Sequence, residues 1–199
     1  MKPLEERVQK AVQEPVVLSP YDPAWPRMFE REKKHLYKCL PKELVKRVEH
    51  IGSTAVPNLC AKPVIDILVE VTSLEETKKR IVPLLHNQKY DYFWRPTFGD
   101  DTPPFYAWFI KRNAKGDRTH HIHMVEKNFE HWDRLLFRDY LIEFPEVAKE
   151  YKNLKLSLAH DYPYDRIAYA NGKKEFIDHV TRKAKEYYAW HESQGTRDS

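Results

Sequence analysis

The sequence predicts an α+β domain with a mixed or antiparallel sheet flanked by helices and followed by a helical C-terminal region. Three observations support this fold class. Short segments rich in β-branched and aromatic residues lie between residues 44 and 125. Segments with apolar residues at helical spacing precede and interrupt them. From about residue 128 only helical patterns follow. The predicted order is helix, two strands, helix, three strands and three helices, which is typical of α+β proteins.

The first helix is predicted over residues 23 to 40. Asp22 can cap it, and Pro23 suits the first helical position because its missing N–H costs nothing there. The apolar residues recur near helical spacing, at Trp25, Phe29, Leu36 and Leu40.

Two strands and a helix are predicted next. Residues 44 to 51 form a strand that ends at Gly52, and residues 63 to 71 form a mostly buried one. Ser73 and Glu76 have the spacing of a capping box and begin a helix with Ile81, Leu84 and Leu85 facing inward. Pro83 should kink or shorten that helix.

Three further strands are predicted at residues 90 to 94, 106 to 111 and 119 to 125. The last two are separated by the turn sequence of residues 113 to 117, Asn-Ala-Lys-Gly-Asp, which indicates a hairpin. Residues 98 to 104 look like an exposed loop.

The C-terminal part is predicted to be helical. One helix carries Trp132, Leu135, Leu136 and Tyr140, and a second begins at Pro145 with Val147, Tyr151, Leu154 and Leu158 in register. Asn171-Gly172 breaks the chain before a last helix with Phe176, Ile177, Val180 and Ala184. We therefore expect a flexible N-terminus over residues 1 to 14, a single domain over residues 15 to 190 and a frayed tail over residues 191 to 199.

Composition limits the function classes. The 199 residues include 34 basic and 30 acidic ones, a net charge of +4. This excess does not favour nucleic-acid binding but is compatible with a small anionic ligand. Cys39 and Cys60 have no metal-ligand spacing and are expected to be reduced. The longest apolar run is too short to span a bilayer, and the charged N-terminus does not resemble a signal peptide. We expect a soluble, cytoplasmic protein without membrane contact and predict nothing about its oligomeric state.

One stretch of the sequence could carry chemistry. Gly52, Ser53 and Thr54 follow a predicted strand, where backbone N–H groups and a hydroxyl can approach phosphate oxygens. Asp66 lies inside an apolar strand, where a carboxylate is costly unless it is hydrogen-bonded, paired or bound to a cation. Together they suggest a phosphate-binding turn beside a metal-binding carboxylate, although each piece alone also fits a structural role.

Histidines are the second candidate group. Strand geometry places His121 and His123 on one face and His120 on the other. If this strand lies beside the strand of Asp66, these side chains can bind one divalent ion, with His50 or Glu49 as a fourth ligand. Imidazole suits zinc, manganese, iron or nickel better than magnesium. The alternative is that the histidines bond to backbone or hydroxyl groups.

Two basic residues are candidates for an anion. Lys62 immediately precedes the strand of Asp66, and Arg138 lies on a predicted helix whose apolar face packs inward. The guanidinium group suits phosphate or carboxylate. Either residue fits equally a surface charge or a partner of a nearby carboxylate such as Asp139.

The chain resembles the GrpB family from about Val16 to Trp190. The matching segments are Tyr21-Asp22-Pro23 with Trp25-Pro26, Glu49 to Pro57, Lys62-Pro63 with Ile65-Asp66-Ile67, His121-Ile122-His123, Phe137 to Leu141, Tyr151 with Leu154-Lys155, and Lys174 with Phe176-Ile177. Lys155 matches a family position and is therefore added to the candidate ligand-binding residues.

The resemblance implies a nucleotidyltransferase-like fold. That superfold carries a Gly-Ser turn followed by an Asp-hydrophobic-Asp/Glu pattern on a strand, and Gly52-Ser53 and Asp66 fit it. The second carboxylate position is Leu68 instead. Glu70 lies about 13 Å from Asp66 along a strand, too far for both to bind one ion. This departure argues against the two-metal mechanism of phosphoryl transfer.

Three functions follow as expectations. The first is metal-assisted nucleotidyl transfer from a nucleoside triphosphate, with Asp66 holding Mg, Mn or Zn, Gly52 and Ser53 binding phosphates, and Lys62 or Arg138 neutralising charge. The second is binding of a nucleotide or phosphate compound without transfer. The third follows from relatives fused to dephospho-CoA kinase and is a partner role linked to coenzyme A metabolism. The chain has no P-loop, so it is not itself that kinase.

Overall fold

The computed structural model describes residues 15–97 and 102–195, and the chain divides into two compact units. One unit comprises residues 22–55 and 63–134, and the other comprises the remaining described residues. The expected flexible N-terminus, the start of the loop predicted at residues 98 to 104 and residues 196–199 of the tail lie outside the described residues.

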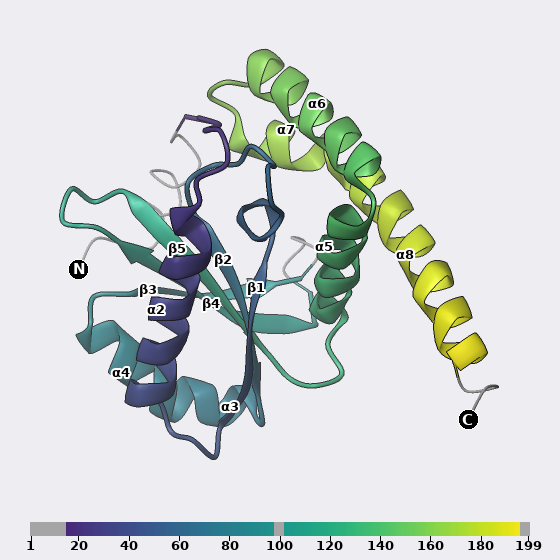
Figure 1. The fold of residues 1–199 in the computed structure, drawn as a ribbon. Helices are drawn as coiled ribbons and strands as arrows, with labels where there is room; N and C mark the ends of the chain where they lie inside the picture. The colour runs from purple at the N-terminus through teal and green to yellow at the C-terminus, as the bar shows by residue number, and fades with distance from the viewer. Residues whose placement is uncertain (1–14, 98–101, 196–199) are drawn as a thin grey trace. The chain divides into compact units, whose positions relative to one another are not determined.

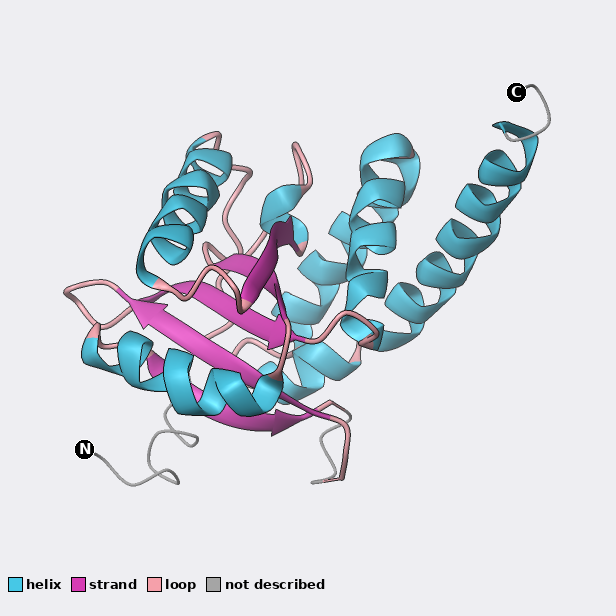
Figure 2. Cartoon of the chain, turned by 90° about the horizontal axis from the view of Figure 1, so that it is seen from below, coloured by secondary structure: helices cyan, strands magenta, loops and turns pink. Residues whose placement is uncertain are grey.

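The first unit is built on one sheet, whose strands are labelled in Figure 1 and magenta in Figure 2. The strand order is β1-β2-β5-β4-β3. The strands are β1 Val45–Ile51, β2 Ile65–Val71, β3 Asp91–Pro96, β4 Phe105–Arg112 and β5 Arg118–Val125. β2 and β5 are parallel, and all other neighbours are antiparallel. The α+β class with a mixed sheet and a helical C-terminal region is therefore confirmed.

Helix α2 (Ala24–Cys39) packs on one face of this sheet, which we name the α2 face. Figure 1 shows α2 lying across the strands. The ring of Phe29 stacks on His50 of β1 with a centroid distance of 4.8 Å. Glu32 is buried and accepts hydrogen bonds from Tyr90 and from Lys111 of β4. Burial and this bond to Glu32 raise the pKa of Tyr90, so the phenol stays protonated.

The helix start differs from the prediction by one residue. Asp22 Oδ1 accepts a hydrogen bond from the Ala24 N–H at 2.8 Å, as a capping carboxylate should. Pro23 is the cap residue itself, and the helix begins at Ala24. Its fixed φ of −60° leads directly into the first turn.

The helix after β2 is interrupted, as Pro83 predicts. It consists of α3 (Leu74–Glu76), a π-helical segment η2 (Thr77–Ile81) and α4 (Val82–Asn87). The Ser73 hydroxyl accepts from the Glu76 N–H at 3.2 Å, which confirms the cap. Leu84, predicted to face inward, is 38% exposed. The wider π turn shifts the phase of the following residues, so of the three residues predicted to face inward Ile81 and Leu85 are buried.

The hairpin between β4 and β5 is confirmed. Asn113 Oδ1 accepts from the N–H groups of Lys115 and Asp117 at 2.9 Å each. Gly116 has a φ of +88°, a conformation that favours glycine.

The second unit is helical around a core of its own. Its helices are α5 (Asp133–Glu143, whose first two residues belong to the sheet unit), α6 (Pro145–Asp161), α7 (Arg166–Asn171) and α8 (Lys174–Gly195). The core contains Val56, Leu59, Phe137, Leu141, Tyr151 and Val180. The sequence missed α7, a short helix capped by Asp165. Asn171 ends α7 where a break was predicted, and α8 continues beyond Trp190 to Gly195.

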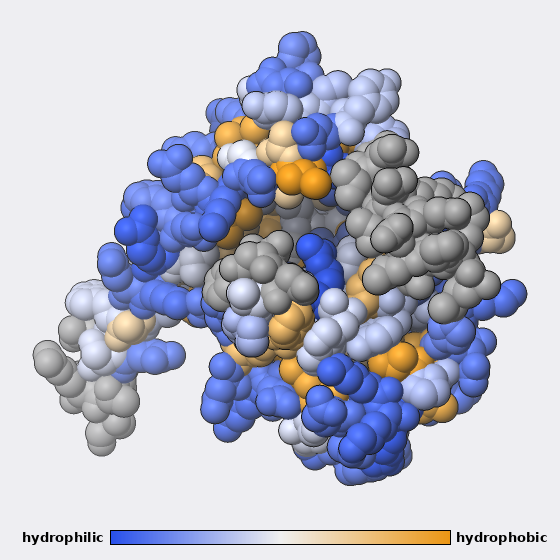
Figure 3. All heavy atoms as spheres, turned by 180° about the vertical axis from the view of Figure 1, so that it is seen from behind, coloured by the Kyte–Doolittle hydropathy of each residue, from blue (hydrophilic) through white to orange (hydrophobic). Residues whose placement is uncertain are grey.

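Hydrophilic residues predominate on the molecular face seen in Figure 3, and apolar groups lie there in separate patches. Among the described helices, none is both long and apolar enough to cross a membrane.

Candidate functional site

Asp66 and His121 meet on adjacent strands. The parallel register of β2 and β5 places them directly opposite each other, as the site hypothesis required. His121 Nδ1 lies 3.0 Å from Asp66 Oδ1. The side chains are 32% and 14% exposed for Asp66 and His121, respectively. A solute can therefore reach the Asp66 carboxylate, and the His121 imidazole holds that carboxylate in its orientation. We name this side of the sheet the Asp66 face.

The Gly52 turn lies against the same carboxylate. Ile51, the last residue of β1, pairs with Asp66. Gly52 follows with a φ of +72°, and a Cβ atom added there would lie 2.6 Å from Asp66 Oδ2. Residues Ser53–Ala55 then form one turn of 3-10 helix. The glycine is required both by its backbone conformation and by the close approach of Asp66.

Thr54 takes no part in the contact between the Gly52 turn and Asp66. Its side chain is buried, and its hydroxyl lies 3.0 Å from His50 Nε2. The 3-10 turn directs successive side chains differently, so Thr54 is a structural partner of His50. The prediction that Thr54 contacts a ligand is not supported by this geometry.

His50 lies on the wrong face of the sheet for the predicted metal role. It pairs with Ile67, one position from Asp66, so its ring points to the α2 face, where it stacks on Phe29. The period of two along a strand explains this separation. Glu49 is on the Asp66 face, but its carboxylate accepts from Arg47 Nε at 2.8 Å.

His123 shares the Asp66 face but pairs with Leu68, two positions further along the strands. Its ring stacks on Tyr106 with a centroid distance of 5.5 Å. Burial first, and then the charge of Arg134, lower the pKa of His123 well below its usual value. Within the described ranges, no three His, Cys, Asp or Glu side chains converge to hold a metal ion. The expected site of Asp66, His121 and His123 is therefore not assembled.

A carboxylate lies beside the position of the missing second acid, because Glu49 of β1 pairs with Leu68. Leu68, at the position where the resemblance predicts a second acid, is fully buried. Glu70 pairs with Val125 towards the other end of the strands. The Gly52 turn itself lies against Asp66.

The three predicted basic residues belong to the helical unit, and their contacts there are structural in kind. Lys155 is buried and donates a hydrogen bond to the Cys60 carbonyl, and burial lowers its pKa to about 8. Lys62 Nζ lies 5.3 Å from the centre of the Tyr169 ring. Arg138 Nε donates to Asp139 Oδ1 at 2.7 Å, which matches the structural alternative for this arginine. The burial of Lys155 and its bond to a backbone carbonyl favour a structural role over the predicted contact with a ligand.

Sequence reasoning missed a group of side chains on the Asp66 face. His123 is surrounded by an imidazole from the segment before α5, two aromatic residues of β4 and two arginines. We name this group the histidine–arginine cluster. Its members are Arg95, Tyr106, Trp108, His123, His131 and Arg134. The alternation of β3 and β4 could have indicated Arg95, Tyr106 and Trp108, which share one strand face. Nothing in the sequence indicates that His131 and Arg134 join them.

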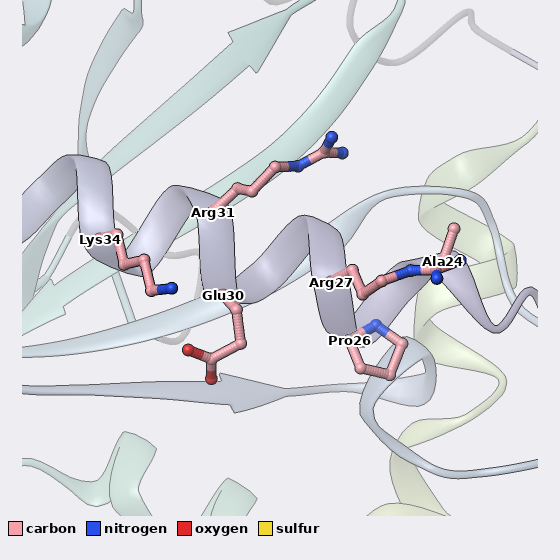
Figure 4. A pocket seen from close by; sticks show the side chains of 6 residues that line it. All are labelled: Ala24, Pro26, Arg27, Glu30, Arg31 and Lys34. Carbon is pink, nitrogen blue, oxygen red and sulfur yellow. The ribbon is translucent and has the colours of Figure 1, made fainter.

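A surface depression also lies along α2 (Figure 4). It is lined by Ala24, Pro26, Arg27, Glu30, Arg31 and Lys34. These side chains come from a single helix, and none of them is a predicted site residue.

Comparisons with known proteins show which family the chain resembles. The family model described as GrpB protein matches residues 15–183. The chain is 37% identical over 166 residues to the "Glutamate-rich protein GrpB" of Alkalihalophilus pseudofirmus, covering 83% of this chain and 93% of that protein. It is similar to the crystal structure of conserved protein GrpB from Enterococcus faecalis, with a TM-score of 0.72 and 35% identity, over 86% of this chain and 99% of that one.

A more distant match has a different name. A protein of Mycobacterium bovis named dephospho-CoA kinase is 32% identical over 190 residues, a match that covers 84% of this chain but only 46% of that protein. The family model spans residues of both compact units, and the GrpB relatives match nearly their whole length. This chain therefore belongs to the GrpB family.

Proposed function

We propose that this protein binds a nucleoside triphosphate, or a related phosphate compound, at the turn formed by Gly52 and Ser53 beside Asp66. The observation that supports it is the contact between the glycine turn and the carboxylate: no side chain larger than hydrogen fits between Gly52 and Asp66 Oδ2. Phosphate oxygens can approach backbone N–H groups closely at such a turn. The match to the nucleotidyltransferase pattern at Gly52-Ser53 and Asp66 supports the same ligand class.

A metal ion fits this site only if it arrives with the ligand. One carboxylate oriented by one imidazole is too few side chains for a tightly held zinc ion, which takes three or four protein ligands. Magnesium is commonly bound by one or two carboxylates together with substrate phosphates. Asp66 would hold such an ion, and the ion would neutralise phosphate charge. His121 would keep the carboxylate in position.

Nucleotidyl transfer is the enzymatic form of this proposal. Asp66 and the Gly52 turn can position a triphosphate, but the buried Leu68 cannot supply a second carboxylate for an acceptor. Binding is therefore better supported than transfer. Incubation of radiolabelled triphosphates with Mg or Mn tests transfer directly, since any turnover that depends on Asp66 would establish it.

Nucleotide binding is tested by calorimetric titration of the common nucleoside triphosphates with and without Mg. We expect saturable binding that Mg strengthens and that the substitution Asp66→Asn weakens by roughly tenfold or more, because the metal loses its charged ligand. Glu70→Gln is the matched control, since it removes a carboxylate from the same strand and the same face. No binding of any nucleotide, or equal losses in both variants, would refute the proposal.

A role linked to coenzyme A metabolism is the second candidate. It rests on the relative named dephospho-CoA kinase, in which the matched region is about half of the protein. Dephospho-CoA and coenzyme A carry adenosine phosphates, so both belong in the titration panel. Binding of either compound in preference to simple nucleotides favours this function. Recovery of a dephospho-CoA kinase in a pull-down without small-molecule binding would indicate a partner role.

A further inference from the structure

The histidine–arginine cluster contains buried polar atoms that have no partner. Trp108 Nε1, His123 Nδ1 and His131 Nε2 are shielded from solvent and make no hydrogen bond among the described residues. An unpaired buried polar group costs about 1–3 kcal/mol, so native proteins rarely leave several together. The rings are close neighbours: the centroid of His123 lies 6.2 Å from Trp108 and 6.1 Å from His131. The unpaired groups therefore form one polar patch.

Two guanidinium groups lie beside this patch. The Arg95 Cζ atom is 4.6 Å from the centre of the Trp108 ring. Arg95 and Arg134 are both close enough to His123 and His131 to act on them electrostatically. Neither arginine makes a hydrogen bond or ion pair within the described ranges. Arg95 is exposed, so a solute can reach its guanidinium group, and Arg134 is half-buried.

The charge of the cluster is positive. Two carboxylates act electrostatically on Arg134. They are Asp66 and Glu130, the latter in the 3-10 turn Glu130–Trp132 that precedes α5. Burial lowers the pKa of Arg134, the direction expected for a cation that lacks a full counter-charge. Among the described residues, no group of three His, Cys, Asp or Glu side chains could hold a metal ion. This argues against a metal cation as the missing partner of the unpaired atoms.

We propose that Arg95, Arg134, His123 and His131 form a binding site for a phosphate group. Guanidinium groups bind phosphate oxygens through charge-assisted, often paired hydrogen bonds. The ionised oxygens of a phosphate group are acceptors, which matches a set of indole, guanidinium and imidazole N–H donors. The inference goes beyond the proposed nucleotide site because it needs neither a metal ion nor Asp66. The ligand is either free phosphate or the phosphate ester of a small metabolite.

Inorganic phosphate is the probe for the first experiment, with no divalent metal present. We expect saturable binding in calorimetry, and movement of the His123 and His131 ring signals in NMR spectra. Arg134→Gln and Arg95→Gln should each weaken phosphate binding by roughly tenfold or more. Arg95→Gln changes an exposed side chain and should fold normally. The control Arg80→Gln removes the same charge from a residue paired with Glu43 and should leave phosphate binding unchanged.

Asp66→Asn separates this site from the proposed nucleotide site. Here it should strengthen phosphate binding or leave it unchanged, because a competing negative charge near Arg134 is removed. The same variant should weaken the binding of Mg-nucleotide. Sodium acetate and a phosphate monoester, used as further probes, distinguish carboxylate, free phosphate and ester. The proposal is overturned if phosphate does not saturate, if acetate binds as tightly, or if Arg80→Gln weakens binding as much as Arg134→Gln.

Discussion

Gly52 and Asp66 show how single residues determine the candidate site. The sequence places a glycine after one strand and a carboxylate on the next, and the structure brings them so close that a Cβ atom added to Gly52 would lie 2.6 Å from Asp66 Oδ2. Gly116 offers a natural comparison, because it also has a positive φ but a Cβ atom added there would have nothing within 4 Å. The two glycines therefore separate the cost of backbone conformation from the cost of crowding.

Gly52→Ala should lower the free energy of unfolding by about 2 kcal/mol or more, since both the left-handed conformation and the contact with Asp66 oppose a methyl group. Gly116→Ala should cost only about 1 kcal/mol, because conformation alone opposes it. Urea unfolding of both variants measures the difference. Equal losses would mean that Asp66 does not crowd Gly52.

Helix α6 contributes a buried lysine to the helical unit. Lys155 hydrogen-bonds to the carbonyl of Cys60, in the segment of residues 56–62 that runs between β1 and β2 and belongs to this unit. The resemblance to the GrpB family made Lys155 a candidate ligand-binding residue, and the structure shows it buried. A carbonyl of an irregular segment needs a donor, and the long side chain of lysine supplies one.

Lys155→Met should lower the free energy of unfolding by about 1–3 kcal/mol, because it preserves volume but leaves the Cys60 carbonyl without its donor. It should leave nucleotide affinity unchanged. Lys152→Met, an exposed residue of the same helix, is the control and should change stability little. Thermal unfolding together with nucleotide titration measures both effects. A loss of affinity without a loss of stability would restore the ligand-binding role of Lys155.

Buried histidines give the whole molecule a pH-dependent stability. Burial lowers the pKa of His120 on the α2 face, and of His123 and His131 in the histidine–arginine cluster. For His131 the pKa falls from 6.5 to about 2. The folded state thus binds fewer protons than the unfolded state below pH 6.5. The folded state is therefore most stable, with respect to these histidines, above pH 6.5, and it loses stability as the pH falls below that value.

Each such histidine should reduce the free energy of unfolding by about 1.4 kcal/mol for every pH unit below its unfolded pKa. Replacing His131 by Gln should therefore flatten the pH dependence, whatever it does to stability at neutral pH. Urea unfolding at a series of pH values between neutral and mildly acidic measures this slope. His179→Gln, at an exposed position of α8, should keep the wild-type slope. An unchanged slope in His131→Gln would contradict the buried, neutral state of His131.

Local patterns in the sequence determined the elements of this fold. Alternation and β-branched residues located the strands, Asn113 to Asp117 located the hairpin, and Ser73 located a helix start, because each acts through neighbouring residues along the chain. The alternation within β5 likewise separated His120 from His121 and His123. These are short-range effects of backbone geometry.

Tertiary structure alone decided which residues meet. The register of β2 against β5 and β1 brought Asp66 to His121 and turned His50 to the α2 face, since a shift of one residue reverses every side chain of a strand. The pairing of β4 with β5, and the return of residues 130–134 to the same face, assembled the histidine–arginine cluster. Such contacts depend on residues far apart in the chain, whose approach no local pattern encodes.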